Sequence, residues 1–244
     1  MESAQVRAKK GQGIDDVVRG LSPGVLDIQR QIISSVLSDE YQELFSAYES
    51  LLHEFLSVGP QTFAAQTTEL VRDTNFPLTG KPLKSILSPV QINSFFIATF
   101  PYEGEQHYDK ATGLFLTKLM QNSYYAGFND FVLGADADLD WLGTRMQGTH
   151  ANPIRIKFKG NIFDAASLAT HVNLVVYGNV KWIGSSAKHC EFTLHGDYLE
   201  LFRPQNCTIK TPNYAQAQII ATDLPEGNKV IYIQPDGQEQ EVRR

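Results

Sequence analysis

Three aspartates at alternating positions, Asp136, Asp138 and Asp140, carry the side-chain type that hard metal ions prefer. Alternating carboxylates open a calcium-binding loop, in which a glycine and a distal glutamate complete the ligand set. That glycine and that glutamate are missing from the required places in this sequence. We therefore favour a solvated acidic loop and keep a metal site as the alternative.

Two histidines, His171 and His189, stand 18 residues apart at the same position of a repeat described below. Neighbouring β-strands lie about 4.8 Å apart, so two imidazoles at such positions could share a metal ion. The interpretation that we favour is a polar corner ladder that hydrogen-bonds the turn backbone. Asn206 continues this ladder.

The sequence lacks the common motifs of nucleotide-binding, hydrolase and metalloprotease sites. It contains no phosphate loop, no dinucleotide-binding glycine fingerprint, no nucleophile elbow and no zincin helix. We therefore assign no catalytic residue and expect no cofactor.

The overall composition narrows the class of protein. Hydrophobic residues make up 42% and charged residues 20%, which excludes disorder as the overall state. The net charge of −6 argues against nucleic acid as a partner. No apolar run reaches the 18 residues of a membrane span, and no secretory signal precedes residue 20, so we expect no membrane contact and a cytoplasmic location. Cys190 and Cys207 each open an apolar alternation and are expected to be small buried hydrophobes.

A repeat begins at Ile154. Each repeat line is a five-residue alternation that ends near a glycine followed by Asn or Asp, and successive lines start 18 residues apart. The lines start at Ile154, Val172 and Cys190, their structural turns are Gly160, Gly178 and Gly196, and a degenerate fourth line starts at Cys207. Each line has too few inward side chains to form a core alone, so the lines must stack.

Residues 178–197 carry a family resemblance. The segment Gly-Asn-Val-Lys-Trp-Ile-Gly, followed by Lys188 and the line from Cys190, is similar to one turn of the GxGxG β-solenoid. That module forms the C-terminal domain of the glutamate synthase large subunit and the C subunit of formylmethanofuran dehydrogenase. Lys181 stands where glycine is usual, and His189-Cys190 replaces a glycine pair. The resemblance implies a shape and no catalytic residue, because the module is mainly structural in those enzymes.

The expected fold class is α+β: an N-terminal helical and mixed α/β part followed by a short single-stranded β-solenoid of about four 17–18-residue rungs. The expected organisation is a flexible tail over 1–20, a helical and mixed α/β region over 21–149, the β-solenoid domain over 150–235 and a polar tail over 236–244. Helices are predicted over 25–37, 41–56, 62–72, 89–99 and 112–122, and a strand over 130–133.

The clearest helical period runs from Tyr41 to Leu56, with apolar residues at steps of three and four. This stripe could bind a protein partner or a second copy of the chain. The interpretation that we favour is packing within the same chain.

These observations predict a non-catalytic scaffold or assembly protein. The alternative is an enzyme, or an accessory subunit of one, with a site in the groove between the solenoid and the α/β part. A second alternative is a small-ligand or carbohydrate-binding module that uses Trp141 and Trp182. We expect a homodimer, formed either through the C-terminal end near Ile231 or through the Tyr41–Leu56 stripe.

Overall fold

The computed structural model describes residues 39–57, 83, 85–201 and 203–243. The tail expected over 1–20 and the helices expected over 25–37 and 62–72 lie outside the described residues. Within the described part, no helix is both long enough and apolar enough to cross a bilayer.

Three helices form the N-terminal end of the described structure: α3 (Asp39–Ser57), α5 (Pro89–Ala98) and α6 (Tyr108–Tyr125). Helix α5 begins at the predicted Ser88-Pro89 signal. The Ser88 hydroxyl accepts the Gln91 N–H, and the Gln91 side chain accepts the Ser88 N–H. This capping box satisfies two backbone donors that the first helical turn would otherwise leave unpaired.

The apolar stripe of α3 is buried inside its own chain. Tyr48 meets Phe95 and Phe115 edge-on, with ring centroids 5.9 and 5.5 Å apart, and its hydroxyl lies 2.8 Å from the Thr112 hydroxyl. Tyr41, Leu44, Leu51 and Leu52 are also buried. The part of the stripe from Tyr41 to Leu52 therefore packs mainly within the chain.

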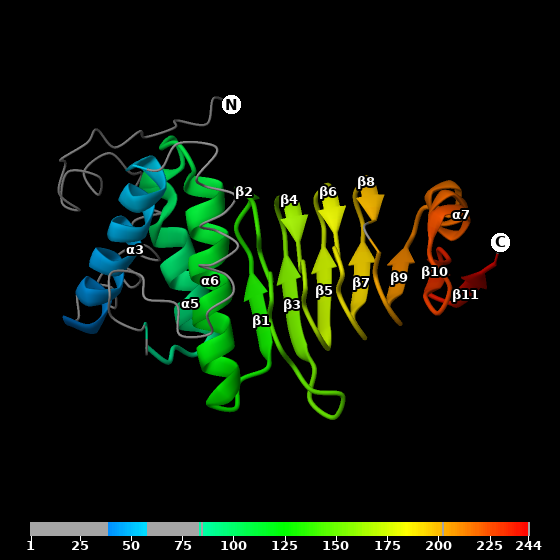
Figure 1. Cartoon of the computed structure of the whole chain (residues 1–244), viewed down its shortest axis with the longest axis horizontal. Coiled ribbons are helices and arrows are strands. Elements are labelled where there is room, and N and C mark those ends of the chain that lie inside the picture. The colour runs from blue at the N-terminus through cyan, green and yellow to red at the C-terminus, as the bar shows by residue number, and fades with distance from the viewer. Residues whose placement is uncertain (1–38, 58–82, 84, 202, 244) are drawn as a thin grey trace.

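A seven-stranded sheet follows the helices (Figure 1). Its order is β1-β3-β5-β7-β9-β10-β11, and every pairing is parallel except that of β10 with β11. The strands are β1 (Asp130–Leu133), β3 (Ile154–Phe158), β5 (Val172–Val176), β7 (Glu191–Leu194), β9 (Thr208–Thr211), β10 (Lys229–Ile233) and β11 (Glu239–Val242).

A second, four-stranded parallel sheet lies beside the first, in the order β2-β4-β6-β8. The chain alternates between the two sheets: β4, β6 and β8 each follow a glycine corner, and β2 follows Ala137 at the equivalent position. The strands are β2 (Asp138–Leu139), β4 (Asn161–Ala165), β6 (Val180–Ile183) and β8 (Tyr198–Leu201). Single parallel bridges then join Gln147, Thr170, Lys188 and Gln205 in a third ladder.

The predicted fold class is wrong. The described residues form a mixed α/β fold with one mostly parallel sheet and one parallel sheet, and not a single-stranded β-solenoid of four rungs. Strands β1 and β2 precede residue 150, and β10 and β11 follow residue 211. The second sheet was not predicted, and the pairing of β10 with β11 is antiparallel. The second sheet was not predicted because buried and open residues do not alternate strictly along its strands. In β6, for example, Lys181 and Trp182 are consecutive and both half-buried.

The register predicted for the repeat lines is confirmed. Leu174 pairs with Ile156 on one side and with Phe192 on the other, and Phe192 pairs with Ile209. All four side chains are buried. Equivalent positions of successive lines therefore stack in one interior column.

The corner glycines are needed for space. A Cβ added to Gly178 would overlap the carbonyl oxygen of Gly160, and one added to Gly196 would overlap that of Gly178. Their φ angles are not positive, so glycine is required here for the close approach of the backbone and not for a left-handed conformation. Left-handed backbone occurs instead at the opposite corner, at His171, His189 and Asn206.

The two ends of the sheets are covered differently. Helix α5 packs against β1, where the Gly134 N–H donates to Asn93 Oδ1 at 2.9 Å, and α6 packs against β2. At the other end, α7 (Tyr214–Asp223) packs against β9 and β10 and buries Ile220. Residues expected as a polar tail form β11, which among the described strands pairs with β10 alone.

Candidate functional site

The three sequence-predicted aspartates do not converge. Asp136 and Asp138 are exposed, whereas Asp140 is 2% exposed. Asp138 accepts a hydrogen bond from the Asn161 side-chain amide at 2.8 Å. Within the described residues no three His, Cys, Asp or Glu side chains are grouped so that they could hold a metal ion.

Asp140 joins helix α6 to strand β4. Its Oδ1 accepts the N–H groups of Trp141 at 2.9 Å and of Asp164 at 3.0 Å, and its own N–H donates to the Asp109 carbonyl at 3.1 Å. Burial, followed by the negative charges of Asp109 and Asp164, raises the pKa of Asp140 to about 7. Burial also raises the pKa of Asp164. A buried carboxyl with such a pKa can be held in its neutral form near neutral pH.

The partners Asp109 and Asp164 were missed by sequence reasoning. Asp164 occupies the same strand position as Trp182, with which it pairs, and as Glu200 in the next strand. Aligning the second-sheet strands would have found it. Asp109 comes from the first turn of α6, and no local signal connects it to Asp140.

His171 and His189 do lie side by side, and His150 extends the group. The rings of His171 and His189 are stacked, with centroids 5.1 Å apart and planes 14° apart, and His150 lies 5.9 Å from His171. Burial, then His189 and His150, lowers the pKa of His171. Because imidazole lone pairs lie in the ring plane, two nearly parallel rings do not aim at one metal ion.

The backbone of these histidines forms a ladder at this corner, whereas the favoured interpretation assigned the ladder to their side chains. The His171 N–H donates to the Lys188 carbonyl at 3.1 Å, and the His189 N–H donates to the Gln205 carbonyl at 3.0 Å. The hydrogen bonds that join successive corners therefore come from main-chain donors, while the stacked rings lie outside.

A groove of about 530 Å³ runs along the four-stranded sheet from the start of α6. Phe163 lines it and is 41% exposed, and its ring meets Trp182 edge-on at 4.7 Å. The Lys181 ammonium lies 4.1 Å from the Phe163 centroid and 4.7 Å from that of Trp182. The Trp182 indole N–H donates to Glu200 at 3.0 Å, which fixes the ring.

One wall of this groove is a polar ladder at the glycine corners. The Asn179 N–H donates to Asn161 Oδ1 at 2.8 Å, and the Asp197 N–H donates to Asn179 Oδ1 at 2.9 Å. The other sequence-predicted tryptophan, Trp141, is half-buried and lies under the Lys110 ammonium at 5.5 Å. Of the two tryptophans, Trp182 is therefore the one in contact with a groove-lining ring.

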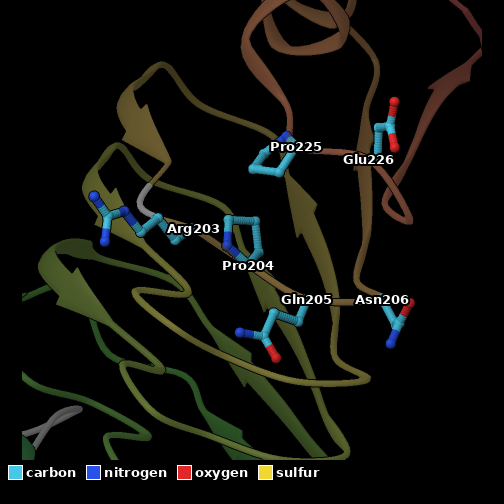
Figure 2. A pocket seen from close by; sticks show the side chains of 6 residues that line it. All are labelled: Arg203, Pro204, Gln205, Asn206, Pro225 and Glu226. Atoms are coloured by element: carbon cyan, nitrogen blue, oxygen red, sulfur yellow. The ribbon is translucent and has the colours of Figure 1, made fainter.

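A second pocket, of about 380 Å³, lies where the corner ladder ends (Figure 2). Figure 2 shows it between the corner that carries Pro204 and Asn206 and the loop that carries Pro225 and Glu226. Arg203 and Gln205 complete its lining. Cys207 follows this corner directly in the chain.

The chain matches no protein-family model, no curated protein and no solved structure. The resemblance of residues 178–197 to the GxGxG module therefore stays a prediction.

Proposed function

We propose that this chain is a non-catalytic scaffold or assembly protein that associates with a second copy of itself through the free edge of β11. The observation that supports the proposal is the direction of the β11 backbone. The Gln234 N–H donates to the Gln238 carbonyl at 2.8 Å, which fixes the hydrogen-bonding phase of the hairpin. Opposed residues in an antiparallel pair alternate between bonded and non-bonded, so Glu239 and Glu241 direct their N–H and C=O groups away from β10.

An unpaired strand edge is a template for another strand. The first strand of the same sheet, β1, lies beside helix α5, whereas β11 is exposed along most of its length. Of the two edges of the seven-stranded sheet, the one formed by β11 is therefore the edge at which a further strand can add.

Charge favours one pairing of two β11 strands. In this antiparallel pairing, Glu241 of one chain lies opposite Glu241 of the second copy. Glu239 of one chain then faces Arg243 of the second copy, and the outward N–H groups meet carbonyls. Opposite charges on facing residues stabilise a strand pair, and like charges weaken it. Within its own chain Glu241 already lies 3.3 Å from Arg243, which offsets the central like-charge contact.

The test compares backbone and side-chain changes at one residue. Glu241→Pro removes an outward N–H, and edge strands tolerate proline. Glu241→Ala keeps that N–H and serves as the matched control. Analytical ultracentrifugation should show dimers for the natural chain and for Glu241→Ala, and monomers for Glu241→Pro with unchanged circular dichroism. A natural chain that stays monomeric at micromolar concentrations contradicts the proposal.

The cytoplasmic location belongs to the same proposal. It is supported by Cys190 and Cys207, which are free thiols and not a disulfide.

A second candidate function is the binding of a small ligand such as a carbohydrate in the groove along the four-stranded sheet. The exposed Phe163 ring beside the Asn161–Asn179–Asp197 ladder favours it, because apolar lining with a few convergent polar groups is typical of ligand sites. Calorimetric titration with a panel of oligosaccharides should show binding that Phe163→Ala abolishes. Tyr177→Ala, which removes another exposed ring outside the groove lining, should leave binding unchanged.

A further inference from the structure

Cys190 and Cys207 are neighbours across two paired strands. Each directly precedes a strand, and the residues that follow them, Glu191 and Thr208, pair in register. The Cys190 N–H donates to Cys207 Sγ at 3.4 Å. Neighbouring strands lie about 4.8 Å apart, which is inside the Cα separation of about 4.4–6.8 Å that a disulfide spans.

The two thiols differ in chemistry. The Cys190 thiol hydrogen-bonds the Cys207 sulfur, which lowers the pKa of Cys207, while the same interaction and burial raise the pKa of Cys190. The thiolate is the reactive form of cysteine. Asn206, the residue directly before Cys207, lines the pocket in Figure 2, and this position together with the lowered pKa makes Cys207 the sulfur expected to react first.

The pocket at the end of the corner ladder is lined by residues that adjoin Cys207 in the chain. Cys207 is 1% exposed, but it directly follows Gln205 and Asn206, which line the pocket in Figure 2. One side chain holds the opposite wall in place: Asn228 donates to the carbonyls of Pro204 and Pro225, both at 2.9 Å. Opening this loop exposes Cys207 to a small oxidant.

We propose that Cys190 and Cys207 form a reversible disulfide within one chain, with hydrogen peroxide as the oxidant. The Cys207 thiolate attacks one peroxide oxygen and the O–O bond breaks. The leaving hydroxide takes up the thiol proton as water, and Cys207 becomes a sulfenic acid. The Cys190 sulfur then attacks the Cys207 sulfur, the S–O bond breaks, and a second water leaves with the Cys190 proton. Two thiols and one peroxide thus give one disulfide and two waters.

The bridge ties β7 to β9, the strand on which α7 and β10 rest. The spacing of paired strands already lies within the Cα separation that a disulfide spans, so the bridge can form and break without a change in the pairing of β7 with β9.

The first experiment treats the full chain with hydrogen peroxide and measures intact mass after alkylation in denaturant. The expected product has lost two hydrogen atoms, carries no alkylated cysteine, runs as a single chain on a non-reducing gel and regains both thiols with dithiothreitol. Cys190→Ala is the control, because its Cys207 should instead gain one or more oxygen atoms. Two alkylated cysteines in the treated natural chain, oxygen addition without loss of both thiols, or a bridge between two chains would each overturn the proposal.

The second experiment tests the route. Asn228→Ala releases the loop over Cys207 and should speed the loss of thiols several-fold. Asn213→Ala is the matched control, since it removes the side chain that caps α7 at the same end without touching the pocket. Equal rates for the two variants would overturn access through this pocket.

Discussion

The side chain of Asn228 accepts the backbone N–H of Cys207 at 2.8 Å. In the preceding repeat lines the equivalent N–H donates to a cysteine sulfur. The Val172 N–H donates to Cys190 Sγ, and the Cys190 N–H donates to Cys207 Sγ, both at 3.4 Å. Asn228 also donates to the Pro204 carbonyl. One side chain thus satisfies a donor and an acceptor that the end of the ladder would leave unpaired.

Asn228→Ala should therefore lower the free energy of unfolding by about 1–3 kcal/mol, because it strands the Cys207 N–H and the Pro204 carbonyl. Urea denaturation followed by circular dichroism measures the change. Gln218→Ala, on the exposed face of α7, is a control that should stay within about 0.5 kcal/mol of the natural chain. Similar losses for the two variants would show that Asn228 does not terminate the ladder.

Asp140 should make stability depend on pH. Its pKa rises from the ordinary value of 3.8 to about 7 on folding, so the folded state holds the proton more tightly than the unfolded state. Stability from this group is complete below about pH 4, falls as pH rises toward about 7 and is lost above it. Asp140→Asn keeps an oxygen for the Trp141 and Asp164 N–H groups and removes the charge. The difference in the free energy of unfolding between the variant and the natural chain should therefore favour the variant more at pH 8 than at pH 5.

Urea denaturation at both pH values measures this difference. Asp136→Asn is the control, because Asp136 is exposed and lies four residues earlier on the same segment. It should show a similar small effect at both pH values. An Asp140→Asn variant whose effect is also the same at pH 5 and pH 8 contradicts the assigned role.

The sequence allowed one sheet to be predicted and not the other, for a physical reason. Strict alternation from Ile154 to Phe158 and from Val172 to Val176 reflects one buried and one open face, which a period of two reveals. The second-sheet strands place two outward residues in succession, as at Lys181 and Trp182, and the period is lost.

The candidate site was foreseen only in part. Asp140 stood out through its spacing from Asp136 and Asp138, but spacing gave no information on burial. Its pKa is raised first by burial and then by the charges of Asp109 and Asp164, and all three arise from the tertiary packing of α6 and β4 around it. The stacking of His171 on His189 was predictable because a fixed repeat length places equivalent residues on neighbouring strands.

The interior column should dominate stability. Leu174 and Phe192 are 1% and 0% exposed, so Leu174→Ala or Phe192→Ala should each cost about 2–5 kcal/mol through lost burial and a residual cavity. Val175, the neighbour of Leu174 on the opposite face, is half-buried, and Val175→Ala should cost clearly less. Chemical denaturation of the three variants measures the order. Losses below about 0.5 kcal/mol for both interior changes would contradict the assigned inward face.

Gly178 tests whether the glycine corners are needed for close approach of the backbone. A methyl group there would overlap the Gly160 carbonyl and also approach the Asn161 side chain. The stacked lines cannot separate at one corner without breaking the hydrogen bonds of the Asn161–Asn179 ladder, so Gly178→Ala should destabilise the fold by about 1–3 kcal/mol or more. Gly104→Ala is the matched control, because an added Cβ at Gly104 meets no atom within 4 Å. Thermal unfolding should show a lower midpoint for Gly178→Ala and an unchanged midpoint for Gly104→Ala. Equal midpoints would mean that the corner relaxes to admit a side chain. The contact between Gly160 and Gly178 would then not restrict position 178 to glycine.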